Sequence, residues 1–372
     1  MRGILGQQRA IDTLAAALRS GRVPHALIFH GPTGVGKLTT ALAFARILLC
    51  QAPITQLTGD IEACGGCPSC AMLPRPASDA TDGTDAPPPA HPDLHVVCKE
   101  LALHSEDREV RDRKLTTLPV AVLRERLLGP VQRSAVMRGA KVFILDEAEL
   151  LNAEGQNLLL KTLEEPPAGT TLVLVTSQED RLLPTIQSRC GRIAFVPLPD
   201  AQVERWIEPR IGPDWTADDR RWLVSFASGS LGRAALALDG GMHLWARDAA
   251  PAWAALAAGE YPVDWGQRLA ETIDAFAERW VKEHAQASKE AANRRAASLI
   301  AAMLSQQARV RCWEIAPACD PQDPEAAERK LTPWLHAIEA LLEFERLLAS
   351  NVNLGLGCEH LVSRLHRGFT SS

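Results

Sequence analysis

The stretch GPTGVGKLTT, residues 31–40, constrains the fold of this 372-residue chain more than any other. It nearly completes the pattern G-x-x-x-x-G-K-[ST], whose glycines let backbone N–H groups converge on phosphate oxygens while the lysine adds a positive charge. The apolar run HALIFH precedes it, and LTTALAFARILLC follows with apolar residues spaced for one face of a helix. Strand, loop and helix in this order are the context that the pattern requires. The candidate nucleotide-binding residues of this loop are Gly31, Gly34, Gly36 and Lys37.

Leu38 departs from the pattern. The residue after the lysine normally gives its hydroxyl to Mg²⁺, and a leucine has no oxygen to offer. Thr39 carries the nearest hydroxyl and is a further candidate, but one residue along a helix turns the side chain by about 100°. The sequence therefore predicts a loop of phosphate-binding shape that lacks the metal geometry for hydrolysis. ATP with Mg²⁺ stays a candidate cofactor against which Leu38 argues.

Three further apolar runs predict the rest of a sheet: DLHVVC at 93–98, KVFILD at 141–146 and TTLVLVTS at 170–177. Short apolar runs without polar alternation are typical of strands buried on both faces, and the helical patterns between them indicate a parallel α/β sheet. Asp146 and Glu147 end one run, at positions where such proteins hold Mg²⁺ and polarise the attacking water. Thr176 and Ser177 end another, either as sensors of a γ-phosphate or as ordinary polar residues after a strand.

A cysteine cluster, CGGCPSC, predicts a metal site. Four thiolates that meet at one point close a structural zinc site, and an iron–sulfur cluster uses similar spacing. The fourth thiol is either Cys50 or Cys98, and reduced thiols without metal remain the alternative. The candidate ligands are Cys50, Cys64, Cys67 and Cys70.

Two arginines have two interpretations each. Arg189, in LLPTIQSRC, is either a salt-bridged surface residue or an arginine finger offered in trans to the nucleotide of another subunit. Arg233, in GSLGRAAL, stands near the start of a predicted helix and is either a surface residue or a nucleotide contact.

Composition limits the class of protein. With a net charge of −5, the chain lacks the excess of lysine and arginine that is typical of a dedicated nucleic-acid binder. No apolar run approaches the roughly 20 residues of a membrane helix, and the first residues lack the apolar core and cleavage site of a secretory signal. We expect a cytoplasmic protein without a membrane segment, whose nine cysteines are not paired in disulfides.

The distribution of residue types predicts the domain organisation. All nine tryptophans lie beyond Asp200, which places a boundary near Leu198. Beyond it, apolar residues three and four apart and Ala-rich faces predict an all-helical region. Residues 75–92, rich in Pro, Ala, Asp and Thr, have no periodic apolar face, and we expect a disordered surface insertion there.

Taken together, these stretches resemble the clamp-loader branch of the AAA+ ATPases, which serves bacterial DNA polymerase III. The resemblance covers most of the first two hundred residues and is thinner beyond them. It rests on ILGQQRAIDTLAAAL, the P-loop with its flanking strand and helix, CGGCPSC, HPDLHVV, NLLLKTLEEPP and LLPTIQSRC, and weakly on ASNVNLGLGCEHLVSRL. It implies three domains: an AAA+ P-loop domain at 1–198 with a cysteine module at 50–70, a helical lid at 199–242 and a helical collar at 243–372.

The resemblance also implies a function. Members assemble a pentameric ring that uses ATP to open the sliding clamp and load it on primed-template DNA. The stator-type member has a degraded nucleotide site, hydrolyses little or no ATP itself and lends an arginine to its neighbour, a role that falls on Arg189. The cysteines at 50, 64, 67 and 70 match the family's zinc ligands. The implied partners are the gamma/tau and delta subunits, the sliding clamp and DNA.

Two alternatives stay open. Asp146 and Glu147 are retained as in a motor, so the chain would be a hydrolysing gamma/tau-type ATPase if they work without the missing hydroxyl. The other alternative is an AAA+ protein outside replication. Leu38 together with Arg189 favours the stator.

Overall fold

The computed structural model describes residues 1, 3–56, 59–73, 91–107, 117–137, 139–283, 289–318, 323–348 and 353–371. The chain forms two compact units, which we call unit 1 (Met1–Arg210 with Ala227–Ala235) and unit 2 (Ile211–Phe226 with Leu236–Ser372). The division passes through helices α10 (Ala217–Ala227) and α11 (Leu231–Asp239). The three-domain division at 198 and 242 stays a prediction.

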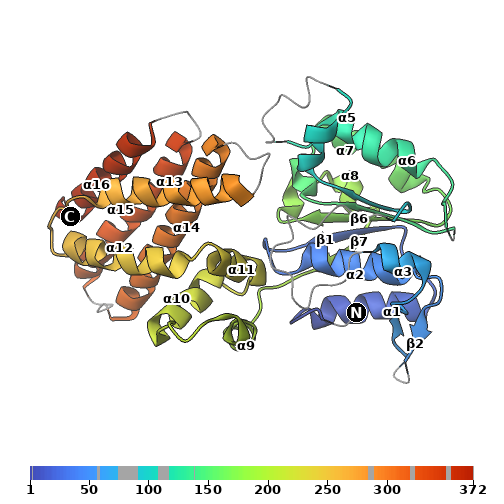
Figure 1. Cartoon of the computed structure of the whole chain (residues 1–372), viewed down its shortest axis with the longest axis horizontal. Helices are drawn as coiled ribbons and strands as arrows, with labels where there is room; N and C mark the ends of the chain where they lie inside the picture. Colours follow the sequence, from blue (N-terminus) through green and yellow to red (C-terminus); the bar gives the residue numbers. More distant parts are fainter. Residues whose placement is uncertain are drawn as a thin grey trace. The chain divides into compact units, whose positions relative to one another are not determined.

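Unit 1 is built on a five-stranded sheet in the order β4-β5-β6-β1-β7, with every neighbouring pair parallel (Figure 1). The strands are β1 (Ala26–His30), β4 (Leu94–Val97), β5 (Lys141–Leu145), β6 (Thr170–Thr176) and β7 (Gly191–Ala194). The parallel α/β domain predicted from the sequence is confirmed, and β1, β4, β5 and β6 are the four strands expected. Strand β7 was not predicted, because three of its four residues are exposed and the run is too short to read as buried.

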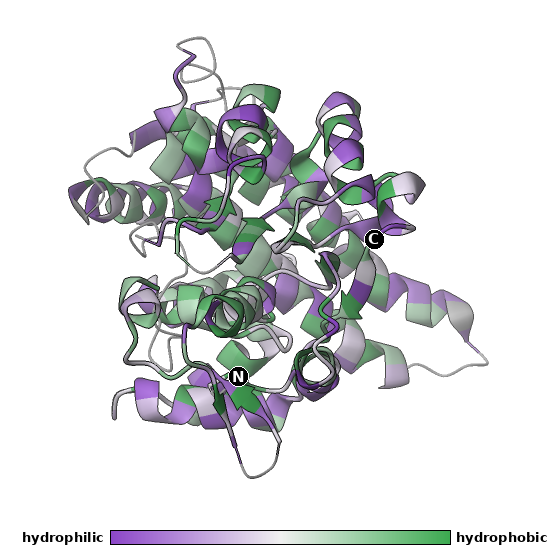
Figure 2. Cartoon of the chain, turned by 90° about the vertical axis from the view of Figure 1, so that its right-hand side faces the viewer, coloured by the Kyte–Doolittle hydropathy of each residue, from purple (hydrophilic) through white to green (hydrophobic). Residues whose placement is uncertain are grey.

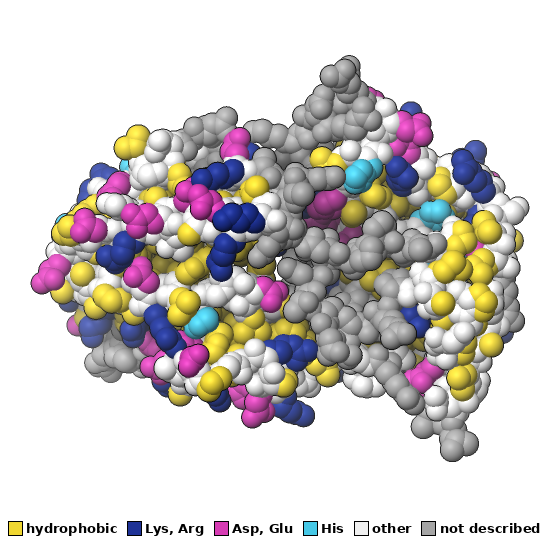
Figure 3. Space-filling model, viewed as in Figure 1, with side chains coloured by type: hydrophobic (Ala, Val, Ile, Leu, Met, Phe, Trp, Pro, Cys, Tyr) yellow, Lys and Arg dark blue, Asp and Glu magenta, His cyan; other side chains and the backbone are white. Residues whose placement is uncertain are grey.

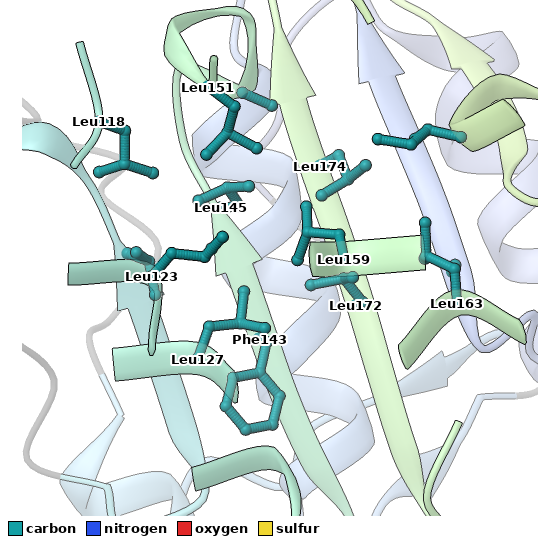
Figure 4. Close-up of a cluster of buried hydrophobic side chains, with 14 of the residues drawn as sticks. Leu118, Leu123, Leu127, Phe143, Leu145, Leu151, Leu159, Leu163, Leu172 and Leu174 are labelled. Atoms are coloured by element: carbon teal, nitrogen blue, oxygen red, sulfur yellow. The ribbon is translucent and has the colours of Figure 1, made fainter. Parts of the chain in front are cut away.

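Helices cover both faces of this sheet. Helices α1 (Gln8–Arg19) and α2 (Lys37–Leu49) lie on one face, and α5 (Val120–Leu123), α7 (Ala153–Glu164) and α8 (Pro184–Gln187) lie on the other (Figure 1). Each face has its own apolar core: one joins α2 to β1 and β6, and the other joins α7 to β5 and β6 (Figure 4). Figure 2 shows the strands as predominantly hydrophobic, as expected of strands buried on both faces.

The connections of unit 1 are short helical turns and one small hairpin. The antiparallel pair β2 (Ile54–Thr55) and β3 (Ile61–Glu62) follows α2. The remaining elements are α3 (Pro68–Met72), η1 (Lys99–His104), η2 (Arg124–Leu128), α6 (Gly129–Val131), η3 (Ala148–Leu150), η4 (Glu179–Arg181), α9 (Asp200–Ile207) and η5 (Glu208–Arg210).

Unit 2 is helical throughout its described residues, as the sequence predicts (Figure 1). Besides α10 and the end of α11 it contains α12 (Met242–Ala257), α13 (Trp265–Glu283), α14 (Lys289–Ile315), η6 (Ala316–Ala318), α15 (Pro324–Leu348) and α16 (Leu354–Thr370). Trp253 packs against Trp265 and Trp334 in its core, and its Nε1 donates to Gln307 Oε1 at 2.8 Å. Tryptophans thus supply the large apolar area that joins α12, α13 and α15.

The surface of unit 2 mixes charges of both signs on the face shown in Figure 3. Among the described helices, none is both long enough and apolar enough to cross a bilayer.

The leucine core of unit 1 gives a matched test of the fold. Leu159 on α7 is fully buried in the cluster of Figure 4, whereas Leu103 in η1 is 46% exposed. Leu159→Ala should lower the free energy of unfolding by about 2–5 kcal/mol through lost burial and a cavity, and Leu103→Ala should change it by less than about 0.5 kcal/mol. Urea unfolding should be followed by far-UV circular dichroism, because Trp206 is the one tryptophan inside unit 1. Equal effects of the two substitutions would contradict the assigned core.

Candidate nucleotide and metal sites

The glycine loop joins the end of β1 to the start of α2, and two of its glycines are required by close approaches. At Gly31 (φ 141°) a Cβ would lie 2.1 Å from the carbonyl oxygen of Phe195, and at Gly34 (φ 76°) it would lie 2.3 Å from Ser230 Oγ. The Gly34 carbonyl accepts a hydrogen bond from Gly232 N at 2.9 Å. The loop is therefore wrapped as the motif predicts, and the GSLGR segment lies directly against it.

Lys37 is the first residue of α2, and its side chain is turned back over the loop. Its Nζ donates to the carbonyl oxygens of Gly31 and Pro32, both at 2.6 Å. Burial lowers the pKa of Lys37, and the carboxylates of Asp146 and Glu149 oppose that shift. The lysine and Asp146 predicted for one site are thus brought together, with Glu149 as a third member.

The two threonines after Leu38 have different surroundings. Leu38 is partly buried and packs against the apolar core beneath α2. The hydroxyl of Thr40 donates to the Gly36 carbonyl at 2.8 Å, and Thr39 is exposed. The face of α2 on which a hydroxyl would meet a metal ion is thus occupied by a leucine that contributes to the core.

Asp146 follows β5 and is half-buried. Partial burial raises its pKa to about 6, the carboxylates of Glu147 and Glu149 add to the rise, and Lys37 opposes it. Its Oδ1 accepts from Glu147 N at 3.0 Å. A carboxyl with a raised pKa near a lysine and a glycine loop is typical of a functional site.

Glu147 is turned away from that group. Its backbone has φ +50°, a left-handed conformation that non-glycine residues rarely adopt. Its Oε1 forms an ion pair with Lys99 Nζ of η1 at 2.8 Å. The candidate base for activating water is therefore bound to a neighbouring lysine.

Glu149 was not predicted from the sequence. Whereas Glu147 is only partly buried, Glu149 is buried. Its side chain is 7% exposed, and Oε1 accepts from Ser177 N at 3.1 Å and from Ser177 Oγ at 2.5 Å. The end of β6 predicted to sense a phosphate thus contacts Glu149, while Thr176 Oγ1 accepts from Gln178 N at 3.1 Å. No sequence signal marked Glu149, because it lies in the 3₁₀ turn η3 whereas Asp146 precedes that turn.

The four cysteines predicted as ligands converge. The Sγ atoms of Cys50, Cys64, Cys67 and Cys70 all lie within 4.8 Å of one another, and those of Cys50 and Cys67 are 4.0 Å apart. Tetrahedral thiolates about 2.3 Å from a zinc ion would be about 3.8 Å apart, so the group fits such an ion. Cys98 lies outside this group, and burial raises its pKa to about 12. The fourth thiol is therefore that of Cys50.

Backbone N–H groups point at these thiols. Cys64 N donates to Cys50 Sγ at 3.2 Å, and Cys70 N donates to Cys67 Sγ at 3.4 Å. At Cys67 burial, which raises the pKa, is outweighed by the N–H groups of Cys70 and Gln51, and the pKa falls to about 6. The turn thus favours the thiolate form that a metal ion requires at Cys67, whereas burial raises the pKa of Cys70 to about 12 in the absence of an ion.

A buried polar bridge ties the cysteine module to the sheet. Ser69 Oγ donates to the Leu49 carbonyl at 2.6 Å and lies 2.9 Å from His91 Nε2. His91 Nδ1 accepts from Asp93 N at 3.1 Å, which leaves Nε2 to carry the proton toward Ser69. The predicted insertion at 75–92 falls mostly on residues outside the described part of the chain, but His91, near its end, is buried in unit 1.

The two candidate arginines occupy different settings. Arg189, just after α8, is 37% exposed; its Nη2 pairs with Glu164 Oε1 at 2.8 Å and its Nη1 donates to the Thr185 carbonyl at 2.9 Å. Arg233 lies in the first turn of α11, where its N donates to Ser230 Oγ at 3.1 Å beside Gly34. Arg189 is thus held at the surface of unit 1, and the backbone of Arg233 adjoins the glycine loop.

Comparison with known proteins decides the family. The family model described as "DNA polymerase III, delta subunit" matches residues 6–199, more than half of the chain. The chain belongs to this family. The matched region holds all the candidate site residues above except Arg233, and the expected kinship with DNA polymerase III subunits is confirmed.

Relatives carry two kinds of name. The chain is 37% identical over 208 residues to DNA polymerase III subunit delta′ of Pseudomonas aeruginosa, covering 55% of this chain and 53% of that protein. It is 32% identical over 237 residues to subunit delta′ of Escherichia coli, with 64% and 61% covered. It is also 32% identical over 197 residues to subunit gamma/tau of Mycobacterium tuberculosis, with 53% and 28% covered. The chain thus spans about half the length of the curated relatives it matches, and less of gamma/tau.

The raised pKa of Asp146 predicts a pH-dependent stability. An aspartate titrates near 3.9 when unfolded and near 6 in this fold, so the stability it contributes is complete below about pH 4 and is lost as pH rises through 6. Asp146→Asn removes the half-buried charge and should stabilise unit 1 by up to about 3 kcal/mol at pH 7.5 but only about 1 kcal/mol at pH 4.5. Urea unfolding at both pH values measures this, with the exposed Asp180→Asn as control. The same gain at both pH values would contradict the shift.

Proposed function

We propose that the chain is the delta-prime-type stator of a cytoplasmic DNA polymerase III clamp loader. In this role it binds the gamma/tau and delta subunits, helps them place the sliding clamp on primed-template DNA, and lends Arg189 to the ATP of a neighbour. The observation that carries the proposal is the combination of Leu38 in the glycine loop with Arg189 at the surface. Membership in a DNA polymerase III family argues against an AAA+ protein outside replication.

Two features of the chain's own pocket support the absence of turnover. Leu38 packs into the core and offers no oxygen to a metal ion. Glu147, in the position of the base, is paired with Lys99. Both the metal geometry and the base that hydrolysis needs are thus compromised, while Lys37 of the loop and Asp146 still lie near each other.

The setting of Arg189 suits an arginine finger. Its guanidinium is held by Glu164 and the Thr185 carbonyl on a partly exposed surface, so a phosphate of another subunit can replace the carboxylate with little rearrangement. An exposed ion pair contributes little stability and is readily exchanged. The helices of unit 2 would then serve as the collar, and Arg233 beside the loop would contact any nucleotide bound there.

Zinc is proposed as a structural ion at the four cysteines. Four thiols complete a tetrahedral shell and leave no open position for chemistry, which is typical of structural zinc. The bridge from Ser69 to His91 would transmit the order of the bound module to β4.

A motor-type ATPase is the second candidate. It is favoured by the retained pair Asp146 and Glu147, and it requires the bond between Glu147 and Lys99 to open. In that case Lys37→Ala would abolish both hydrolysis and clamp loading.

Arg189 gives the decisive test of the stator. Arg189→Ala in the reconstituted loader should reduce ATP hydrolysis at the site it serves by about 10³-fold or more, since a finger stabilises transition-state charge. The control is Arg192→Ala, an exposed arginine on β7 that is paired with Glu179. The isolated chain should show negligible ATPase. Brisk hydrolysis by the isolated chain, or an unchanged loader carrying Arg189→Ala, would overturn the proposal.

Metal content tests the cysteine site. The purified chain should contain about one zinc, and Cys70→Ser should lose it, whereas Cys98→Ser should retain it because Cys98 lies outside the group. Elemental analysis of the three proteins gives the answer. Several irons per chain would instead indicate a cluster, and neither metal would leave four ordinary thiols.

A further inference from the structure

The charges of the nucleotide pocket do not balance. Asp146 and Glu149 lie close enough to Lys37 for both carboxylates to act on its pKa, and Glu149 also acts on Asp146. Glu147 is paired with Lys99, so it has its own cation. Three carboxyl groups, Asp146, Glu147 and Glu149, thus stand beside two lysines, Lys37 and Lys99.

Glu149 has an oxygen atom without a partner. Its Oε1 is occupied by Ser177, whereas Oε2 is inaccessible to solvent and accepts no hydrogen bond within the described part of the chain. The side chain is 93% buried. A buried carboxyl oxygen without a partner needs a cation or a water molecule to satisfy it.

Glu149 offers a carboxylate oxygen to a site in which Leu38 offers no oxygen. A magnesium ion in such a pocket takes oxygen ligands from one or two carboxylates besides phosphates and water. Leu38 removes the hydroxyl, while the turn η3 after β5 carries a second carboxylate, Glu149, that is buried beside the end of β6. The donor set of Asp146 and Glu149 therefore fits a small divalent cation.

We propose that Asp146 and Glu149 together bind a divalent cation, with Glu149 supplying the oxygen ligand that the glycine loop lacks at Leu38. The cation neutralises the excess charge opposite Lys37 and fixes the end of β6 through Ser177. Hydrolysis does not follow, because Glu147 remains bound to Lys99. This site goes beyond the stator role and is independent of Arg189.

The test uses Mn²⁺ as the probe on the full, zinc-loaded chain. Free Mn²⁺ is measured by electron paramagnetic resonance during titration, and Mg²⁺ is added as competitor. Wild-type protein should bind about one Mn²⁺ that Mg²⁺ displaces. Glu149→Gln should weaken binding at least about tenfold, whereas the matched Glu165→Gln, at an exposed glutamate after α7, should change it by less than about twofold.

Several results would overturn the proposal. Equal affinity of wild type and Glu149→Gln would show that Oε2 is satisfied by a water molecule only, and a loss in Glu165→Gln as large as in Glu149→Gln would show that the loss is not specific to Glu149. Absence of Mn²⁺ binding at millimolar concentration would dismiss the site. If Glu149→Gln misfolds by far-UV circular dichroism, Glu149→Asp and Asp146→Asn decide, and each should weaken Mn²⁺ binding. None of these outcomes alters the expected effect of Arg189→Ala on the loader.

Discussion

The parallel direction of the five strands is the constraint on which the sites of unit 1 depend. Parallel strands end at one edge of the sheet, and ligands bind outside those carboxyl ends. The glycine loop follows β1, Asp146 follows β5 and Ser177 follows β6, so residues far apart in sequence meet at this edge. Strands that are buried on both faces must be apolar. The polar side chains that do chemistry therefore stand at the residues that follow the strands.

Much of this arrangement could be predicted because it is local or repetitive. Four of five strands, the loop and the helix after it follow from apolar runs and a short motif. Strand β7 was not predicted, because an exposed edge strand of four residues has no apolar pattern typical of a buried strand. The orientation of Glu147 could not be predicted, since it depends on Lys99, 48 residues earlier, and on a left-handed backbone. Glu149 was not predicted as a site residue, because it is distinguished by its burial, which no sequence motif shows.

The cysteine module shows the same difference between what the sequence predicts and what the structure adds. Spacing alone predicted three ligands, and the family resemblance pointed to Cys50 as the fourth; in the structure the end of α2 places Cys50 beside the turn. Ser69 and His91 then join the two sides of the predicted insertion through a hydrogen bond of 2.9 Å inside the domain.

Leu38 and the carboxylates are best understood together. Leu38 contributes apolar contacts to the core beneath α2, and a serine there would lose them. A chain that needed only a scaffold could gain further by replacing Asp146 and Glu149 with apolar residues, since buried charges without full compensation destabilise a fold. It carries both acids, beside a lysine whose own pKa is lowered by burial. Such unrelieved charge is expected where a ligand supplies the compensation, which supports the cation proposed for Asp146 and Glu149.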